Sequence, residues 1–210
     1  MKKERQTERR KMEDEKKRTA RKEVFSWVRM FAIVIIVVFV LTQFIIINAK
    51  IPSGSMENTI MTHDRLIGFR FAYWFDEPQR GDIILFEYPV DEKQIYIKRV
   101  IGLPGETVEI RDGHVYIDGS DEPLQEDYLK EEWTWENDGY TFVVPEGCYF
   151  VMGDNRNDSE DGRLWAGEAL KSGVASTPEE AEKYSYVRKD QIKGKAIFKY
   201  YSKFAILNAK

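Results

Sequence analysis

The sequence predicts a mainly β domain that follows a single N-terminal transmembrane helix. Two observations carry this prediction: an uncharged apolar stretch at residues 30–47, and a series of short apolar runs separated by turn residues from residue 80 onward. The 210 residues include 12 Phe, 11 Tyr and 5 Trp, which a disordered chain would lack. Cys148 is the single cysteine, which excludes an internal disulfide and a zinc site built from several thiolates.

Charge is divided unevenly along the chain. Residues 1–24 carry 11 Lys and Arg against 6 Asp and Glu, a net +5, and Arg29 adds one positive charge. The remainder carries −10, so the formal net charge of −4 conceals a basic start and an acidic body. Residues 1–27 are therefore predicted to form a solvated, largely disordered basic tail. Its interspersed acids and the absence of aromatic residues before Phe25 argue against nucleic-acid binding.

Residues 28–49 are predicted to form the transmembrane helix. Residues 30–47 contain only Thr42 and Gln43 as polar side chains. As a helix they would be about 27 Å long, close to the ~30 Å hydrocarbon thickness of a bilayer. Uniform hydrophobicity argues against a buried core helix, and the length of the run argues against a cleaved secretion signal. The Lys and Arg excess before the span places the tail in the cytoplasm and residues 50–210 outside.

Residues 50–210 are predicted to form one β domain with a short helical insert at residues 166–186. Seven apolar runs are bounded by turns, at residues 83–86, 95–103, 108–110, 115–117, 141–144, 148–152 and 196–200. Asp112-Gly113, between the third and fourth runs, is typical of a two-residue hairpin turn. Inside the insert, Thr177, Pro178 and Glu180 form a helix-start signal, with Thr177 as the N-cap.

Three segments carry chemistry beyond strands and turns. Ser53-Gly54-Ser55-Met56 places two hydroxyls around a glycine shortly after the span. In the second segment, strand alternation puts Ile97 and Arg99 on one face and Lys98 on the other, so either face holds a charge among apolar neighbours. A lysine buried there would have a lowered pKa and could act as a general base, whereas one that snorkels to water could not. The third segment is the polar run 153–163, whose ligand spacing excludes an EF-hand.

A serine nucleophile needs a base, and the sequence offers histidine or lysine. His63 lies in a polar connection, and His114 follows the Asp112-Gly113 turn. No Gly-x-Ser-x-Gly motif surrounds Ser55. A serine with a lysine base is therefore the stronger constellation.

These residues resemble the bacterial type I signal peptidases, membrane-anchored Ser/Lys endopeptidases of peptidase family S26. The resemblance covers residues 51–105, residues 153–165 and, more loosely, residues 192–196. Its motifs are Ser-Gly-Ser-Met at 53–56, Arg-Gly-Asp-Ile at 80–83, Tyr-Ile-Lys-Arg at 96–99 with Gly-Leu-Pro-Gly at 102–105, and Gly-Asp-Asn-Arg at 153–156. Four ordered motifs after one anchor make the resemblance specific, and it implies the signal-peptidase-like β catalytic domain.

The resemblance also implies a role for each matching residue. Ser55 matches the nucleophile and Lys98 the general base, while the Ser53 hydroxyl would act with the Ser55 backbone N–H on the tetrahedral oxyanion. Ser159 matches the hydroxyl that orients the lysine amine. Charged positions that brace the site are matched by Asp154, Asp161, Arg99 and Arg163, with Arg99 and Asp154 as a pair. The walls of shallow pockets for small side chains are matched by Ile51, Met56 and Ile97.

Two positions depart from the family pattern. Asn58 stands where the family commonly has proline, and Gly162 stands where a serine often precedes the last arginine. Both are supporting positions, so altered rigidity without loss of the chemistry is expected.

The implied activity is removal of signal peptides from exported precursor proteins, after small residues, at the outer face of the cytoplasmic membrane. The implied partners are signal-peptide-bearing precursors, membrane lipid and a secretion translocon, without nucleic acid, metal or organic cofactor. One alternative is a membrane-tethered β module that binds peptide or cell-wall polymer without catalysis. Another is a self-cleaving Ser/Lys repressor peptidase, which would need a DNA-binding domain where this chain has its span.

Overall fold

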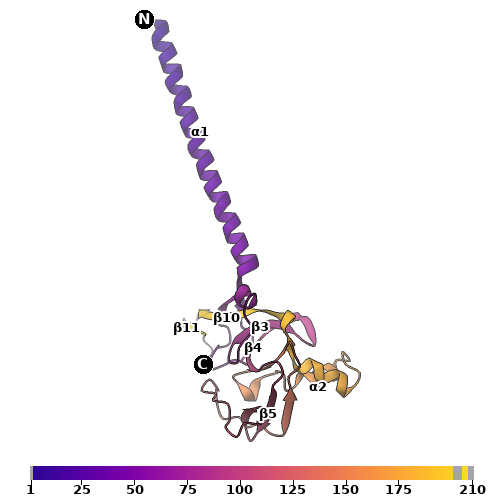
Figure 1. Ribbon diagram of the computed structural model, residues 1–210. Helices are drawn as coiled ribbons and strands as arrows, with labels where there is room; N and C mark the ends of the chain where they lie inside the picture. Colours follow the sequence, from indigo (N-terminus) through magenta and orange to yellow (C-terminus); the bar gives the residue numbers. More distant parts are fainter. Residues whose placement is uncertain (1, 201–204, 208–210) are drawn as a thin grey trace. The chain divides into compact units, whose positions relative to one another are not determined.

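The computed structural model describes residues 2–200 and 205–207 (Figure 1). The chain divides into two compact units, Met1–Ile45 and Ile46–Lys210. The first unit consists of helix α1 (Lys2–Val40) and a π-helical turn (Leu41–Ile45). Within the described residues, Lys16–Ile45 is the one helical segment long and apolar enough to cross a membrane.

The first unit differs from the sequence prediction at both ends. α1 begins at Lys2, so the basic tail that was expected to be largely disordered is helical. Lys, Arg and Glu are good helix formers, and no Gly or Pro occurs between residues 2 and 40. At the other end the helical geometry stops at Ile45, so the predicted helix boundary at residue 49 is wrong. Ile46–Lys50 form strand β1 because their backbone pairs with a strand further along the chain.

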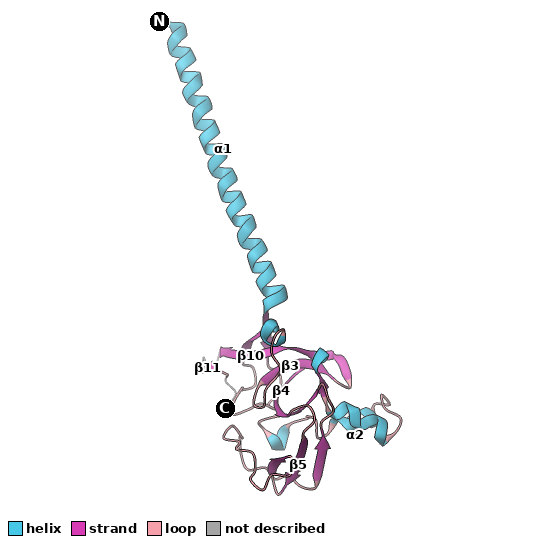
Figure 2. Cartoon of the chain, viewed as in Figure 1, coloured by secondary structure: helices cyan, strands magenta, loops and turns pink. Residues whose placement is uncertain are grey.

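The second unit is mainly β, as predicted (Figure 2). Each of the seven predicted apolar runs forms a strand. The strands are β1 (Ile46–Lys50), β2 (Arg65–Phe69), β3 (Ile83–Tyr88), β4 (Asp91–Gly102), β5 (Thr107–Arg111), β6 (His114–Ile117), β7 (Tyr140–Val143), β8 (Cys148–Met152), β9 (Val187–Arg188), β10 (Ile192–Tyr200) and β11 (Ala205–Ile206). The helices are α2 (Trp165–Lys171) and α3 (Pro178–Glu182), with 3-10 turns at Arg70–Tyr73, Arg156–Asp158, Lys183–Ser185 and Lys189–Gln191.

Two antiparallel sheets are formed within the described residues. The larger has the strand order β1-β2-β10-β3-β4-β8-β9, with β11 also paired to β10, and the smaller has the order β6-β5-β7. β5 and β6 form the predicted hairpin, in which Arg111 pairs with His114. Asp112 and Gly113 both have positive φ, 47° and 74°, as this type of two-residue turn requires.

The register of β3 and β4 determines the surroundings of Lys98. Leu85 pairs with Ile97, and both belong to one apolar cluster. The next pair, Ile84 with Lys98, points to the opposite face, where Ile84 belongs to a second cluster. Lys98 is therefore fixed beside a fully buried aliphatic side chain, and only 4% of it is exposed.

The insert at residues 166–186 holds one more helix than the start signals predicted. Thr177 caps α3 as expected, since its hydroxyl accepts from the Glu180 N–H at 3.2 Å. The Glu180 carboxylate accepts a hydrogen bond from the Ser176 N–H at 2.9 Å. In a capping box it would instead accept from the N–H of the N-cap residue, Thr177. α2 gave no start signal because the residue before it, Leu164, has no side-chain cap to offer.

Candidate active site

The loop between β1 and β2 carries Ser55. The two ends of this loop are joined by a hydrogen bond from the Ile51 N–H to the Asp64 carbonyl, at 2.9 Å. Directly after the serine, the Ile60 N–H donates to the Met56 carbonyl at 2.7 Å, which forms a helical turn. Ser55 itself is 6% exposed, so packing and backbone hydrogen bonds hold its hydroxyl in place.

Lys98 reaches this hydroxyl from β4. The Lys98 Nζ and Ser55 Oγ atoms lie 2.7 Å apart, within hydrogen-bond distance. The amine also lies 5.5 Å from the centroid of the Tyr96 ring. The structure thus brings together the two residues that the sequence singled out as nucleophile and base, in the geometry that activation of a serine requires.

Burial lowers the pKa of Lys98 to about 8, because the ammonium form loses its hydration. The carboxylates of Asp161, Glu160 and Asp154 oppose this lowering, and the guanidinium of Arg163 adds to it. A substantial fraction of Lys98 is therefore neutral in mildly alkaline solution. The snorkelling alternative does not hold for this side chain, because Lys98 is buried.

The two histidines occupy other places. His63 lies near the end of the Ser55 loop with a φ of 73°, and His114 begins β6 in the smaller sheet. The side chain that contacts the Ser55 hydroxyl is Lys98. The geometry therefore favours lysine over histidine as the base.

The loop after β8 braces the Ser55 loop. The Asn155 N–H donates to the Ser55 carbonyl at 3.1 Å, and its side-chain Nδ2 donates to the Gly54 carbonyl at 3.0 Å. A Cβ at Gly153 would overlap the Ser55 carbonyl and the Ser159 side chain, so this close approach requires glycine. Asn155 was not among the predicted site residues, although it lies inside the Gly-Asp-Asn-Arg motif.

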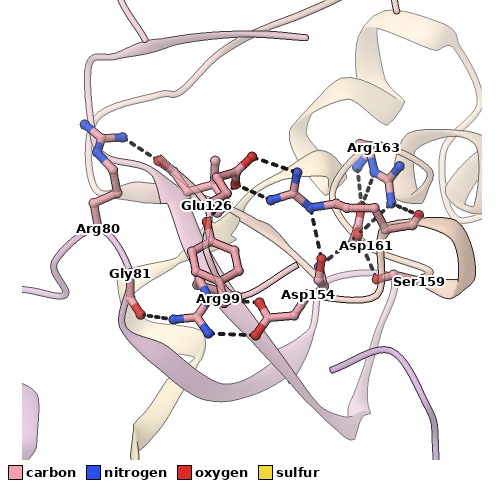
Figure 3. A network of polar contacts seen from close by, with 12 residues as sticks. Arg80, Gly81, Arg99, Glu126, Asp154, Ser159, Asp161 and Arg163 are labelled. Carbon is pink, nitrogen blue, oxygen red and sulfur yellow. Dashed lines mark hydrogen bonds and ion pairs between the residues drawn. The ribbon is translucent and has the colours of Figure 1, made fainter. Parts of the chain in front are cut away.

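Arg99 and Asp154 form a buried two-pronged ion pair (Figure 3). Arg99 Nε lies 2.8 Å from Asp154 Oδ1, and Nη2 lies 2.6 Å from Oδ2. The remaining guanidinium nitrogen donates to the Gly81 carbonyl at 2.9 Å, and the Thr59 hydroxyl donates to the Asp154 carboxylate. This pair, which was expected from the sequence, therefore links β4, the Arg-Gly-Asp-Ile motif and the Ser55 loop.

A second buried ion pair joins Asp161 and Arg163, and Ser159 contacts it (Figure 3). Arg163 Nε lies 2.8 Å from Asp161 Oδ1, and the Ser159 hydroxyl donates to Asp161 Oδ2 at 2.7 Å. Burial alone would raise the pKa of Asp161, but the charge and hydrogen bonds of Arg163, together with hydrogen bonds from the Gly153 N–H and the Ser159 hydroxyl, hold that pKa below its usual value. The hydroxyl of Ser159 is thus oriented by Asp161, and its action on Lys98 stays a prediction.

A segment outside the motifs, between β6 and β7, also packs on the site. Glu126 accepts from Arg156 Nη1 at 3.1 Å, and both side chains are buried. Cζ of Arg99 lies 3.8 Å from the centroid of the Tyr128 ring. Cζ of Arg156 lies 4.9 Å from the centroid of the Trp133 ring. Sequence reasoning missed these three residues because nothing local to them identifies their partners.

Ser55 and Lys98 open onto a cleft of about 460 Å³. Its lining residues are Pro52, Ser53, Gly54, Ser55, Gln94, Ile95, Tyr96, Ile97, Lys98, Asp158 and Glu160. Ser53 is exposed on this lining, where its hydroxyl can meet a substrate. Of the expected pocket-wall residues, Ile97 lines the cleft, whereas Ile51 and Met56 are buried in the same apolar cluster as Ile97.

Both departures from the family pattern are built into the local structure. Asn58 has a φ of 83°, which proline cannot adopt, and its Nδ2 donates to the carbonyls of Tyr128 at 3.1 Å and Leu129 at 3.2 Å. A Cβ at Gly162 would come within 2.7 Å of the Phe150 ring and of a backbone carbonyl, so a serine would require a shift. The 2.7 Å contact between Lys98 and Ser55 is present beside both departures.

Comparison with known proteins identifies the family. A family model described as signal peptidase, peptidase S26, matches residues 24–201. The chain is 44% identical over 140 residues to a probable signal peptidase I-1 of Synechocystis sp., covering 63% of this chain and 69% of that protein. It is 34% identical over 175 residues to a signal peptidase I of Bacillus licheniformis, covering 79% and 92%. A crystal structure of a signal peptidase I from Enterococcus faecalis is 36% identical, with a TM-score of 0.42, and covers 57% of this chain and 97% of that one. Because the family model matches most of the length of this chain, the chain belongs to the signal peptidase family, peptidase S26.

Proposed function

We propose that this chain is a membrane-anchored serine endopeptidase that removes signal peptides from exported precursor proteins, with Ser55 and Lys98 as its catalytic dyad. The observation that carries the proposal is the 2.7 Å contact between Lys98 Nζ and Ser55 Oγ in a chain of this family. The matched relatives are named signal peptidases, which supports signal-peptide-bearing precursors as the substrate class.

The reaction proceeds through an acyl enzyme. Neutral Lys98 takes the proton of Ser55 as Oγ attacks the carbonyl carbon of the small residue that precedes the scissile bond. The Ser53 hydroxyl and the Ser55 N–H donate to the oxyanion of the tetrahedral intermediate. Protonated Lys98 then gives its proton to the leaving amine, and after returning to the neutral form it activates the water that releases the signal peptide.

The supporting residues hold this geometry. Ser159, oriented by Asp161 at 2.7 Å, keeps its oxygen lone pairs available to the Lys98 amine. The Arg99 and Asp154 pair fixes β4 against the Ser55 loop. Buried aliphatic side chains around Ile97 keep the pockets narrow, which restricts the residues beside the scissile bond to small ones.

The N-terminal helix serves as the anchor. The basic segment before it favours a cytoplasmic position for residues 1–27 and an extracytoplasmic position for the catalytic domain within residues 50–210. A helix that ends at Ile45 leaves few residues before Ser55, so the nucleophile would work close to the lipid surface. Membrane lipid and a secretion translocon are the partners that this placement brings near.

A cleavage assay tests the proposed function. The full chain in detergent micelles is given a precursor with an Ala-x-Ala site, and a single cut after the second alanine is expected. Ser55→Ala protein, and a precursor with bulky residues in place of both alanines, are the matched controls and should show no cut. An intact precursor with the wild-type chain, or normal cleavage by Ser55→Ala, would contradict the proposal, and the second result would favour a binding module.

Activity should fall in acid because protonated Lys98 cannot act as the base. The pKa of Lys98 is lowered to about 8, so the neutral fraction decreases about tenfold per pH unit below that value. Between pH 8 and pH 6 the expected loss of kcat/KM is about fifty-fold. Initial rates at constant ionic strength measure it, and a flat profile over this range would remove Lys98 from the role of base.

A further inference from the structure

Two acidic side chains flank the buried Ser159. Ser159 has an extended backbone, with φ −137° and ψ 118°, so its neighbours on either side point away from it. Ser159 is 5% exposed, whereas Asp158 and Glu160 are both exposed. The alternation that buries the serine therefore presents two carboxylates to the outside.

Both carboxylates line the cleft that contains Ser55 and Lys98. Asp158 Oδ2 lies 3.5 Å from the position that a Cβ on Gly54 would take, and so stands close to the Ser55 loop. Glu160 is held by the Tyr88 hydroxyl, which lies 3.1 Å from its Oε1. These contacts give the two carboxylates defined places on the rim of the cleft.

Glu160 also has a firm support. The Tyr88 ring stacks on the Tyr96 ring with centroids 4.3 Å apart and planes 1° from parallel. Tyr88 is 5% exposed, and Tyr96 lines the cleft beside Lys98. The hydrogen bond to Tyr88 therefore comes from a rigid part of the wall, and Glu160 is kept over the cleft.

The rim is acidic when the enzyme is in its productive state. Among the described residues that line the cleft, Lys98 is the one with a basic side chain, and it must be neutral to act as the base. Asp158 and Glu160 then leave the lining with two uncompensated negative charges. Outside the lining, Lys130 lies within electrostatic range of Asp158, but its ammonium is bound to Glu57 at 3.0 Å. Lys171 lies within electrostatic range of Glu160, but its ammonium is bound to Glu168 at 2.7 Å.

We propose that Asp158 and Glu160 form an acidic rim that makes the peptidase favour precursors with a basic residue beside the small-residue cleavage site and reject those with an acidic residue there. This inference rests on the proposed function, because it concerns the substrates of the same dyad. A cleft lined by one sign of charge attracts the opposite charge and repels its own, and low-dielectric walls strengthen both effects. The rim adds a charge preference to the size preference of the pockets.

The test uses peptides that share one Ala-x-Ala site and differ in a single residue. Lys, Gln or Glu is placed in turn at the x position and at the first and second residues after the cut. For the full chain in uncharged detergent micelles, kcat/KM for the Lys peptide should exceed that for the Glu peptide about tenfold at one or more positions in low salt. The ratio should shrink towards about threefold as salt is raised.

Variants then assign the preference to the rim. In the double variant Asp158→Asn with Glu160→Gln, the ratio should fall to within about twofold of one, whereas Asp121→Asn, at an exposed position outside the cleft lining, should keep the wild-type ratio. Because both peptides meet the same enzyme sample, the ratio does not depend on how much of a variant is folded. Equal cleavage of all peptides by the wild-type chain, or a full preference in the double variant, would overturn the rim, while no cleavage of any peptide would instead refute the proposed function.

Discussion

Lys98→Met is expected to lower kcat for precursor cleavage by about a thousandfold. Methionine is close to lysine in length and suits a buried apolar site, so the replacement removes the amine while keeping the space filled. Without the amine 2.7 Å from its oxygen, Ser55 has no base to accept its proton. Single-turnover and steady-state rates with the Ala-x-Ala precursor measure the loss.

The same substitution should stabilise the protein. Below pH 8, Lys98 is protonated in the folded and the unfolded state, and burial of the ammonium disfavours the folded one. A pKa lowered from 10.5 to about 8 corresponds to at most about 3 kcal/mol of destabilisation, which the variant would escape. The difference in unfolding free energy between Lys98→Met and the wild type should be fully present below pH 8. It should disappear as the pH rises towards 10.5, where the lysine is neutral in both the folded and the unfolded state.

The opposite changes in rate and stability separate a catalytic role from a structural one. Lys93→Met, at an exposed position of the same strand, is the matched control and should leave both quantities near their wild-type values. A Lys98→Met protein that is inactive because it is unfolded would show a lower melting temperature. A folded variant that retains more than about a tenth of the wild-type kcat would contradict the dyad.

The strands were predictable because their signals are local, and the contact between Ser55 and Lys98 was predictable because their motifs resemble those of a known family. The apolar runs that became β3 to β8 and β10 carry their own turn residues, such as Asp112-Gly113, and the alternation around Lys98 already indicated a charge among apolar neighbours. The four ordered motifs added the pairing with Ser55, which lies 43 residues away in the sequence. The strands depend on periodicity and composition, which a single sequence displays, whereas the pairing of Ser55 with Lys98 rests on the resemblance.

The remaining features depend on contacts that form after folding. Ile46 and Ile47 continue the apolar span without a break in the sequence. Their assignment to β1 follows from their pairing with β2, which the local sequence does not indicate. Glu126, Tyr128 and Trp133 resemble ordinary residues of an acidic connection, and their partners Arg156 and Arg99 are distant in sequence. In both cases contacts between segments distant in the sequence determine the structure, and local secondary-structure propensity does not indicate those contacts.

Asp154→Ala is expected to cost about 3 to 5 kcal/mol of unfolding free energy. The side chains of Arg99 and Asp154 are 3% and 0% exposed, so the substitution leaves a buried guanidinium without its counter-charge. It also removes the acceptor of the Thr59 hydroxyl, which lies on the Ser55 loop. Urea unfolding of the full chain in detergent micelles, followed by tryptophan fluorescence, measures the loss.

A double variant tests whether the uncompensated charge causes that loss. Arg99→Met combined with Asp154→Leu removes both charges and fills the space with apolar groups, so it should recover most of the stability. Activity should recover less, because the Thr59 hydroxyl and the Gly81 carbonyl still lack their partners and the Ser55 loop is held less firmly against β4. If the losses of stability from the two single substitutions simply add in the double variant, Arg99 and Asp154 act independently. In that case their ion pair would not be what joins the Ser55 loop to the strand that carries Lys98.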